Sequence, residues 1–142
     1  MIVQTKTVSF TTELLEAIHN FSAGGDTFKI ALYTALATLN ATTTGYTSAN
    51  EVVGSGYTAG GKALTISTTP TFSGTTSFVS FANAVWSGAA LTARGALIYN
   101  SSKSNRSVMV LDFGSDITST ALTGFSVTFP TAMAGTAILQ IS

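Results

Sequence analysis

The chain has 142 residues and no cysteine, so it has the size of one domain and lacks disulfides and thiolate metal sites. Six Lys and Arg residues balance six Asp and Glu residues, and only 8% of all residues are charged, against about 25% in an ordinary soluble domain. This composition excludes binding to a nucleic-acid phosphate backbone, and no run of about 18 apolar residues is present that would span a membrane.

The N-terminal region is predicted to contain a short strand near Ile2–Val8 and the only helix. The helix is expected from Thr12 to Phe21, with a threonine as its N-cap and Gly24-Gly25 as its stop signal. An apolar stripe along it is expected to dock on a sheet. The stripe consists of Leu14, Leu15, Ile18 and Phe21.

Beyond the helix the apolar residues recur with a period of two, which is typical of half-buried strands. The clearest example is Phe28–Tyr33. Similar runs follow at Ala63–Thr68, Ser77–Ala82, Thr92–Asn100, Ser107–Phe113, Gly124–Phe129 and Thr136–Ile141. No crossover helices separate these runs. We therefore predict an all-β fold for residues 1–142, an antiparallel β-sandwich or jelly roll of about eight strands with one short N-terminal helix.

The segment 35–61 contains little that resembles a strand. Loops of this length are uncommon in compact domains unless they bind something or pack on a neighbour. Its aromatic and β-branched residues argue against disorder. We predict an ordered arm or extended loop whose apolar side chains contact a partner. These side chains are Leu36, Leu39, Tyr46, Val52, Val53 and Tyr57.

The clearest hairpin joins Thr92–Asn100 to Ser107–Phe113 through a polar tip. The tip contains Lys103 and Arg106, two of the six Lys and Arg residues. A solvated loop is the favoured interpretation, because exposed loop tips are commonly charged. The alternative is an electrostatic contact between these two cations and a partner.

Residues that move protons are scarce in this chain. His19 is the only histidine, and its place beside the helical stripe favours a structural role. No G-x-S-x-G nucleophile motif is present. Asp112 and Asp116 are close in sequence but lack the surrounding ligands of a calcium loop. The sequence therefore predicts no catalytic residue, no cofactor, no metal site and no enzymatic activity.

Five segments carry a resemblance to a known group of proteins. They are KIALYT at 29–34, NEV at 50–52, GYTAGG at 56–61, ARGALIYN at 93–100 and LDFG at 111–114. Their order resembles small virion proteins encoded by tailed bacteriophages and prophages. The resemblance implies a capsid decoration (cement) protein on the outside of the head shell. Its partners would then be the major capsid protein or other virion proteins, and its location the virion, assembled in the host cytoplasm.

The oligomeric state and two alternative functions stay open at this point. The resemblance implies a homo-oligomer, a dimer or trimer, and near-zero net charge also promotes association. A tail, collar or neck component of the virion would have the same composition. A carbohydrate-binding β-sandwich is the other alternative, in which aromatic rings stack on sugars. The rings would be those of Tyr46, Tyr57, Trp86 and Tyr99.

Overall fold

The computed structural model describes every residue from Met1 to Ser142 and is mostly β. All paired strands are antiparallel, so the prediction of an antiparallel, mostly β chain with one short helix is confirmed. The elements are β1 (Thr5–Lys6), α1 (Val8–Leu15), β2 (Phe28–Tyr33), β3 (Lys62–Ala63), β4 (Ile66–Ser73), β5 (Thr76–Phe81), β6 (Ala84–Trp86), β7 (Thr92–Asn100), β8 (Arg106–Thr118), β9 (Phe125–Val127) and β10 (Leu139–Ile141).

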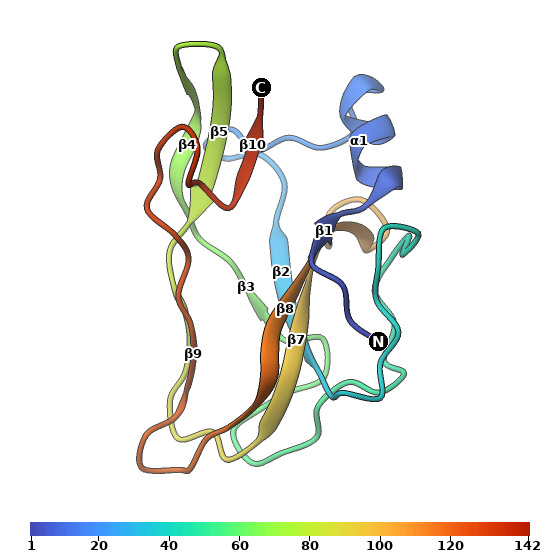
Figure 1. Cartoon of the computed structure of the whole chain (residues 1–142), viewed down its shortest axis with the longest axis vertical. Coiled ribbons are helices and arrows are strands. Elements are labelled where there is room, and N and C mark those ends of the chain that lie inside the picture. Colours follow the sequence, from blue (N-terminus) through green and yellow to red (C-terminus); the bar gives the residue numbers. More distant parts are fainter.

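The strands form three open sheets. The largest has the order β1-β8-β7-β2-β3, and the two smaller ones have the orders β10-β5-β4 and β6-β9. Figure 1 shows the strands of the smaller sheets along one side of β2, β7 and β8. A cluster of 22 buried residues takes members from the larger sheet and from both smaller sheets. The main core therefore lies between the larger sheet and the two smaller ones.

The opposite face of the larger sheet is also buried. In β2, Phe28, Ile30 and Leu32 belong to the main core, whereas Ala31 and Tyr33 belong to a second cluster of eight buried residues. The second cluster also contains residues of the N-terminal segment and of the arm 35–61. Because side chains alternate between faces along a strand, the arm and the N-terminus cover the outer face of the larger sheet.

Helix α1 begins earlier and is shorter than predicted. Its N-cap is Thr7, whose Oγ1 accepts the Phe10 N–H at 3.4 Å, and Ala17 has a left-handed φ of 59° just beyond the last turn. The expected helix from Thr12 to Phe21 is therefore wrong. The chain leaves the helix so that Phe21 packs on Phe28, with ring centroids 4.2 Å apart. Leu15 is 91% exposed and does not take part in docking.

The hairpin of β7 and β8 lies where it was predicted, with Ile98 opposite Met109. The arm contains no strand between Tyr33 and Lys62, as expected. Three features were not predicted: the three-residue strand β6, the extension of β8 to Thr118, and the division of the expected strand Ala63–Thr68 into β3 and β4, of which β4 runs on to Ser73. The second follows a register shift between Ala93 and Gly95, an irregularity that alternation alone does not reveal.

Candidate functional site

Glu51 is a buried carboxylate that holds separate parts of the arm together. It is the only charged residue between positions 35 and 61 and is 8% exposed. Its Oε1 accepts the Tyr57 hydroxyl at 2.6 Å and the Gly60 N–H at 2.7 Å, while Oε2 accepts the Tyr46 hydroxyl at 2.7 Å. Hydrogen bonds to a carboxylate are stronger than those between neutral groups. Glu51 therefore stabilises the arm through three such bonds.

All four tyrosines of the chain gather around this carboxylate. Tyr33 donates to the Thr47 carbonyl at 2.6 Å, and Tyr99 donates to the Gly60 carbonyl at 2.7 Å. The rings of Tyr46 and Tyr99 stack with centroids 4.9 Å apart. Burial and the neighbouring Glu51 raise the pKa of Tyr46 to about 12, and the same two causes raise the pKa of Tyr99. These two phenols therefore remain hydrogen-bond donors at neutral pH.

Four of the five segments that carry the sequence resemblance meet around this carboxylate. Tyr33 belongs to the first segment, Glu51 to the second, Tyr57 and Gly60 to the third, and Tyr99 to the fourth. Each supplies a donor or an acceptor that joins the arm to itself or to the sheet. These residues therefore have a structural role, because they hold the arm together and join it to the sheet.

Gly61 makes the close approach of the arm to β2 feasible. Its φ is +70°, and a Cβ at this position would lie 1.8 Å from the Ile30 carbonyl oxygen. Such a contact is sterically impossible, so any other residue would push the arm away from β2. Gly60, beside it, offers its N–H to Glu51 and its carbonyl to Tyr99.

The arm residues predicted to contact a partner separate into buried and exposed groups. Leu39 is 2% exposed and Val52 is 3% exposed, and both lie in the chain's own core. Tyr46 and Tyr57 are partly buried against the same clusters. The prediction that Leu39 and Val52 face a partner is corrected, because both are buried within the chain. Of the predicted set in the arm, Leu36 and Val53 remain exposed, at 79% and 97%.

The two cations of the hairpin tip are paired within the chain. Arg106 donates to Glu13 Oε1 at 2.7 Å, and Lys103 Nζ lies 3.9 Å from Asp26 Oδ1. Burial raises the pKa of Asp26, but the Asn100 amide, a backbone N–H and Lys103 outweigh it and hold that pKa below its usual value. The tip is therefore an element of a charge network that ties the hairpin to the helix and the segment after it.

His19 lies at the centre of that network. Its side chain is fully buried, with Nε2 at 2.7 Å from Glu13 Oε2 and Nδ1 at 3.0 Å from Asn100 Nδ2. Asn100 Oδ1 accepts the Ser102 N–H and its Nδ2 donates to Asp26, which fixes the amide orientation. Since an amide nitrogen only donates, Nδ1 accepts and Nε2–H donates to Glu13. Both ring nitrogens are thus occupied, which is the arrangement of a structural histidine.

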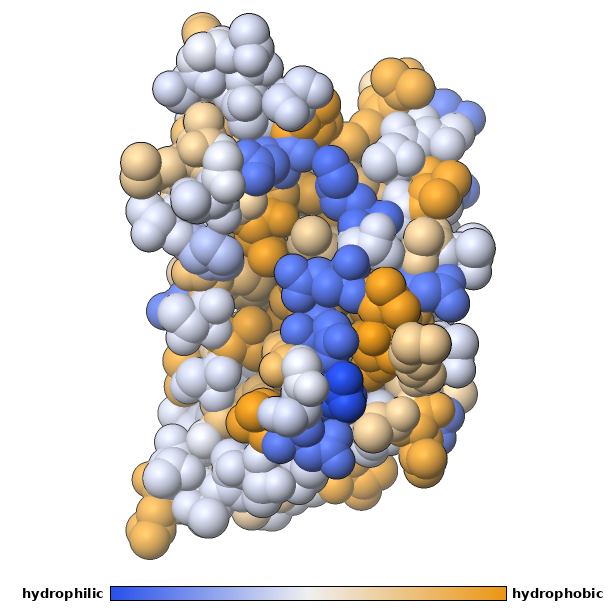
Figure 2. Space-filling model, in the orientation of Figure 1, coloured by the Kyte–Doolittle hydropathy of each residue, from blue (hydrophilic) through white to orange (hydrophobic).

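Charged groups in the rest of the chain are also largely satisfied internally. Arg94 pairs with Asp112 at 3.0 Å, which together with the Gly114 N–H lowers the pKa of that carboxyl. Lys62 donates to the Val85 carbonyl and lies over the Trp86 ring. On the face shown in Figure 2, strongly hydrophilic residues form a narrow band, and the rest is weakly polar or apolar. The surface therefore carries little unpaired charge.

The aromatic residues considered for sugar stacking lie mostly inside the fold. Trp86 is 6% exposed and Tyr99 is 2% exposed. Trp86 packs on Phe125 and Tyr57, with centroids 6.2 Å and 6.0 Å away. A ring that stacks on a sugar needs an open face. Trp86 and Tyr99 do not offer one.

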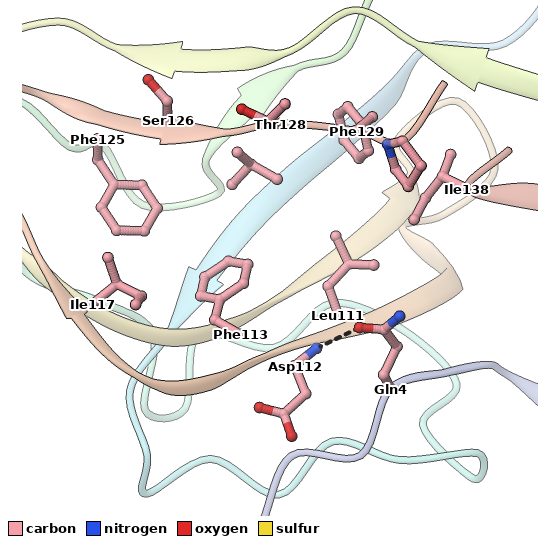
Figure 3. Close-up of a pocket in the computed structure, with 12 residues that line it drawn as sticks. Gln4, Leu111, Asp112, Phe113, Ile117, Phe125, Ser126, Thr128, Phe129 and Ile138 are labelled. Carbon is pink, nitrogen blue, oxygen red and sulfur yellow. Dashed lines mark hydrogen bonds between the residues drawn. The ribbon is translucent and has the colours of Figure 1, made fainter. Parts of the chain in front are cut away.

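An apolar groove of about 310 Å³ opens between β8 and β9. Figure 3 shows Phe113 and Phe125 reaching into it from opposite sides, while Ser126, Thr128 and Asp112 point away. Ligand sites usually combine an apolar lining with a few polar groups that fix orientation. This groove lacks converging polar groups, so it offers apolar contact and no catalytic arrangement.

No three or more His, Asp or Glu side chains are grouped so that they would hold a metal ion. The single helix is too short to cross a membrane. Comparisons with protein-family models, with curated proteins and with solved structures gave no match. Functional inference therefore depends on the geometry above and on the segments that carry the sequence resemblance.

Proposed function

We propose that this chain is a non-enzymatic structural protein of a tailed-bacteriophage virion, a capsid decoration (cement) protein that binds the outside of the head shell and stabilises it. The observation that carries the proposal is the convergence of four of the five resembling segments around Glu51. Their residues hold the arm together through Glu51 and join it to β2 and β7. Their role is to build a rigid module rather than to perform chemistry.

We also propose that the chain folds as a β-sandwich related to a jelly roll. The main core is shared between the larger sheet and the two smaller ones, which supports a β-sandwich related to a jelly roll. The outer face of the larger sheet is covered by the arm, an addition that ordinary sandwiches lack. A module buried in this way on both faces of its main sheet suits a role as a passive structural subunit.

The chemistry of the buried polar groups supports a non-enzymatic role. Both nitrogens of His19 are hydrogen-bonded, and the Glu51 carboxylate accepts three hydrogen bonds. General acid–base catalysis needs a group that reaches the proton of a substrate. His19 has no free ring nitrogen for that contact, and the Glu51 carboxylate is buried with both oxygens engaged.

The neutral surface supports assembly with other virion proteins and with further copies of the chain, as a dimer or trimer. Charged residues are depleted at the centres of protein interfaces, because removing charges from water is costly. Here most charged groups already have partners within the chain. A partner that covers this surface therefore removes few unpaired charges from water.

Cryo-electron microscopy of intact particles, combined with quantitative mass spectrometry, tests the proposal. A decoration protein is expected on the outer shell surface, in a copy number comparable with that of the major capsid protein. A far lower copy number with density at the neck or tail would replace the decoration role by a tail, collar or neck role. Absence of the chain from purified particles would refute a virion role altogether.

A further inference from the structure

A second apolar groove, of about 320 Å³, lies between α1 with the segment after it and the sheet β10-β5-β4. We name it the helix-side groove. Its lining includes no Asp, Glu, Lys or Arg, and the ring nitrogens of its histidine are occupied by Glu13 and Asn100. The apolar lining consists mainly of Phe10, Leu14, Phe21, Val79, Leu139 and Ile141.

The sheet beside this groove extends past the core and leaves apolar side chains exposed. Ser77 pairs with Phe72 on one side and with Ile141 on the other. Directly paired residues point to the same face of a sheet, and so do residues two apart along a strand. Phe72 and Ile141 therefore share the face of buried Val79, yet they are 74% and 54% exposed. Figure 1 shows the hairpin of β4 and β5 projecting at this end of the molecule.

Both edges of the same sheet are protected against strand addition. On β10, Lys6 Nζ donates to the Gln140 carbonyl at 2.9 Å. On β4, Pro70 has no N–H to offer to another strand. Lysine and proline at sheet edges are common devices against edge-to-edge pairing. Association through this sheet therefore favours its exposed face over its edges.

We propose that this face is a self-association surface, in which Phe72 of one copy seats in the helix-side groove of a second copy, and reciprocally. The inference deepens the proposed function, because it rests on the homo-oligomer that the function includes. Phe72 and the groove adjoin on one face, and a projection next to a complementary hollow is what a two-fold interface needs. Both surfaces are uncharged, so their contact brings neither like charges together nor unpaired charges out of water.

Phe72 also has the properties of an interface anchor. It is an exposed aromatic residue close to the tip of a hairpin, with Pro70 of the same strand already lining the groove. Aromatic side chains that fill apolar pockets are enriched among residues that dominate binding energy. The groove volume is near the lower limit for ligand sites, which suits an inserted side chain.

Sedimentation velocity of the purified full chain over a range of concentrations tests this inference. Phe72→Asp is expected to raise the dissociation constant of the dimer by about tenfold or more, because it places a charge in an apolar pocket. Leu122→Asp is the matched control, since Leu122 is 99% exposed in the loop between β8 and β9, at the opposite end of Figure 1. The control is expected to dimerise like the wild type. Both variants should match the wild-type thermal unfolding temperature at a concentration where wild type is monomeric, because neither side chain is buried within the chain.

Engineered cysteines give a second measurement that does not depend on weakening the contact. The chain has no cysteine of its own, so Ser77→Cys, which lies opposite Phe72 on the same face, and Ser22→Cys in the groove lining introduce the only thiols. Mixing the two variants under mild oxidation is expected to give a disulfide between copies. A Ser77→Cys variant mixed with Leu122→Cys should give far less.

A wild-type chain that stays monomeric at all concentrations would overturn the inference, as would equal dissociation constants for Phe72→Asp and wild type. Equal cross-linking in both mixtures would overturn it too. The proposed function fails on a different measurement, the absence of the chain from particles. Dimers sensitive to Phe72→Asp in a protein absent from virions would leave the inference standing and remove only the function.

Discussion

The outer face of the larger sheet is covered within the chain, whereas the end of the sheet β10-β5-β4 is not. The first is closed by the chain's own arm, which a buried carboxylate holds in place. The second extends beyond its cover and exposes Phe72 and Ile141. A long loop rich in apolar residues is therefore no guide to where a partner binds. The uncovered apolar surface lies on a hairpin and not on the arm.

The largest expected effect comes from removing the carboxylate that closes the arm. Glu51→Ala leaves two tyrosine hydroxyls and the Gly60 N–H without their acceptor. Buried donors without partners cost about 1–3 kcal/mol each, so we expect a loss of about 3–5 kcal/mol in the free energy of unfolding. Urea denaturation measures this loss.

Glu16→Ala is the matched control for that experiment, because Glu16 is an exposed carboxylate at the end of α1. It should change stability by no more than about 0.5 kcal/mol. A Glu51→Ala variant as stable as this control would show that the arm is held by its apolar contacts alone.

The next effect separates the buried from the exposed leucine of the arm. Leu39→Ala opens a cavity in the second core cluster and is expected to cost about 2–4 kcal/mol. Leu36→Ala, at a side chain that is 79% exposed, is expected to cost less than about 0.5 kcal/mol. Equal effects of the two substitutions on stability would contradict the placement of the arm on the sheet.

The parts of the fold that depend on local alternation were predictable from the sequence. The β2 segment and the β7–β8 hairpin follow from apolar periodicity and turn residues. The helix start was not, because Thr7, Thr11 and Thr12 have equivalent capping chemistry. Long-range hydrogen bonds that join Thr7 to Val108 and Ser107 of β8 decide between them.

Local sequence patterns also did not predict that the arm packs on the chain's own sheet. The sequence nevertheless contains two signals for this packing. The run Ala96–Tyr99 is apolar at every position, which is typical of a strand buried on both faces. Glu51 is the only charge in a long segment that also contains two tyrosines. Together these indicate a buried carboxylate between phenols over a sheet. Neither signal shows that Tyr33 and Tyr99, which come from distant strands, join the group by donating to the backbone of the arm.

A moderate effect is expected at His19. His19→Gln breaks the bridge between Glu13 and Asn100 and removes a ring that packs 5.0 Å from Phe10. We expect a loss of about 1–3 kcal/mol in the free energy of unfolding with no change in self-association. Thermal unfolding and sedimentation of the same samples measure both quantities. An altered dissociation constant would show that the network shapes the helix-side groove.

The pH dependence of stability is expected to report on Asp26. Its pKa is lowered in the folded chain, because hydrogen bonds and Lys103 together outweigh burial. A lowered folded-state pKa gives stability that is present above the unfolded value of about 3.9 and is lost as the pH falls through the folded pKa. Wild type should therefore exceed Asp26→Asn in stability at pH 7, with the difference shrinking below about pH 4. A difference that is constant from pH 7 to pH 3 would contradict this.

The smallest effect is expected at Lys103, and it decides whether the hairpin tip contacts a partner electrostatically. Reversing Lys103 and Arg106 together would confuse folding with binding, because Arg106 bonds the buried Glu13 at 2.7 Å. Lys103 is 43% exposed and 3.9 Å from Asp26, so Lys103→Ala should cost only a few tenths of a kcal/mol. Attachment of Lys103→Ala and wild type to particles stripped of this protein, measured at low and high salt, then tests the contact itself. We expect identical salt dependence, because Lys103 already has a partner within the chain. A weaker salt dependence in the variant would place the tip in the interface with the shell.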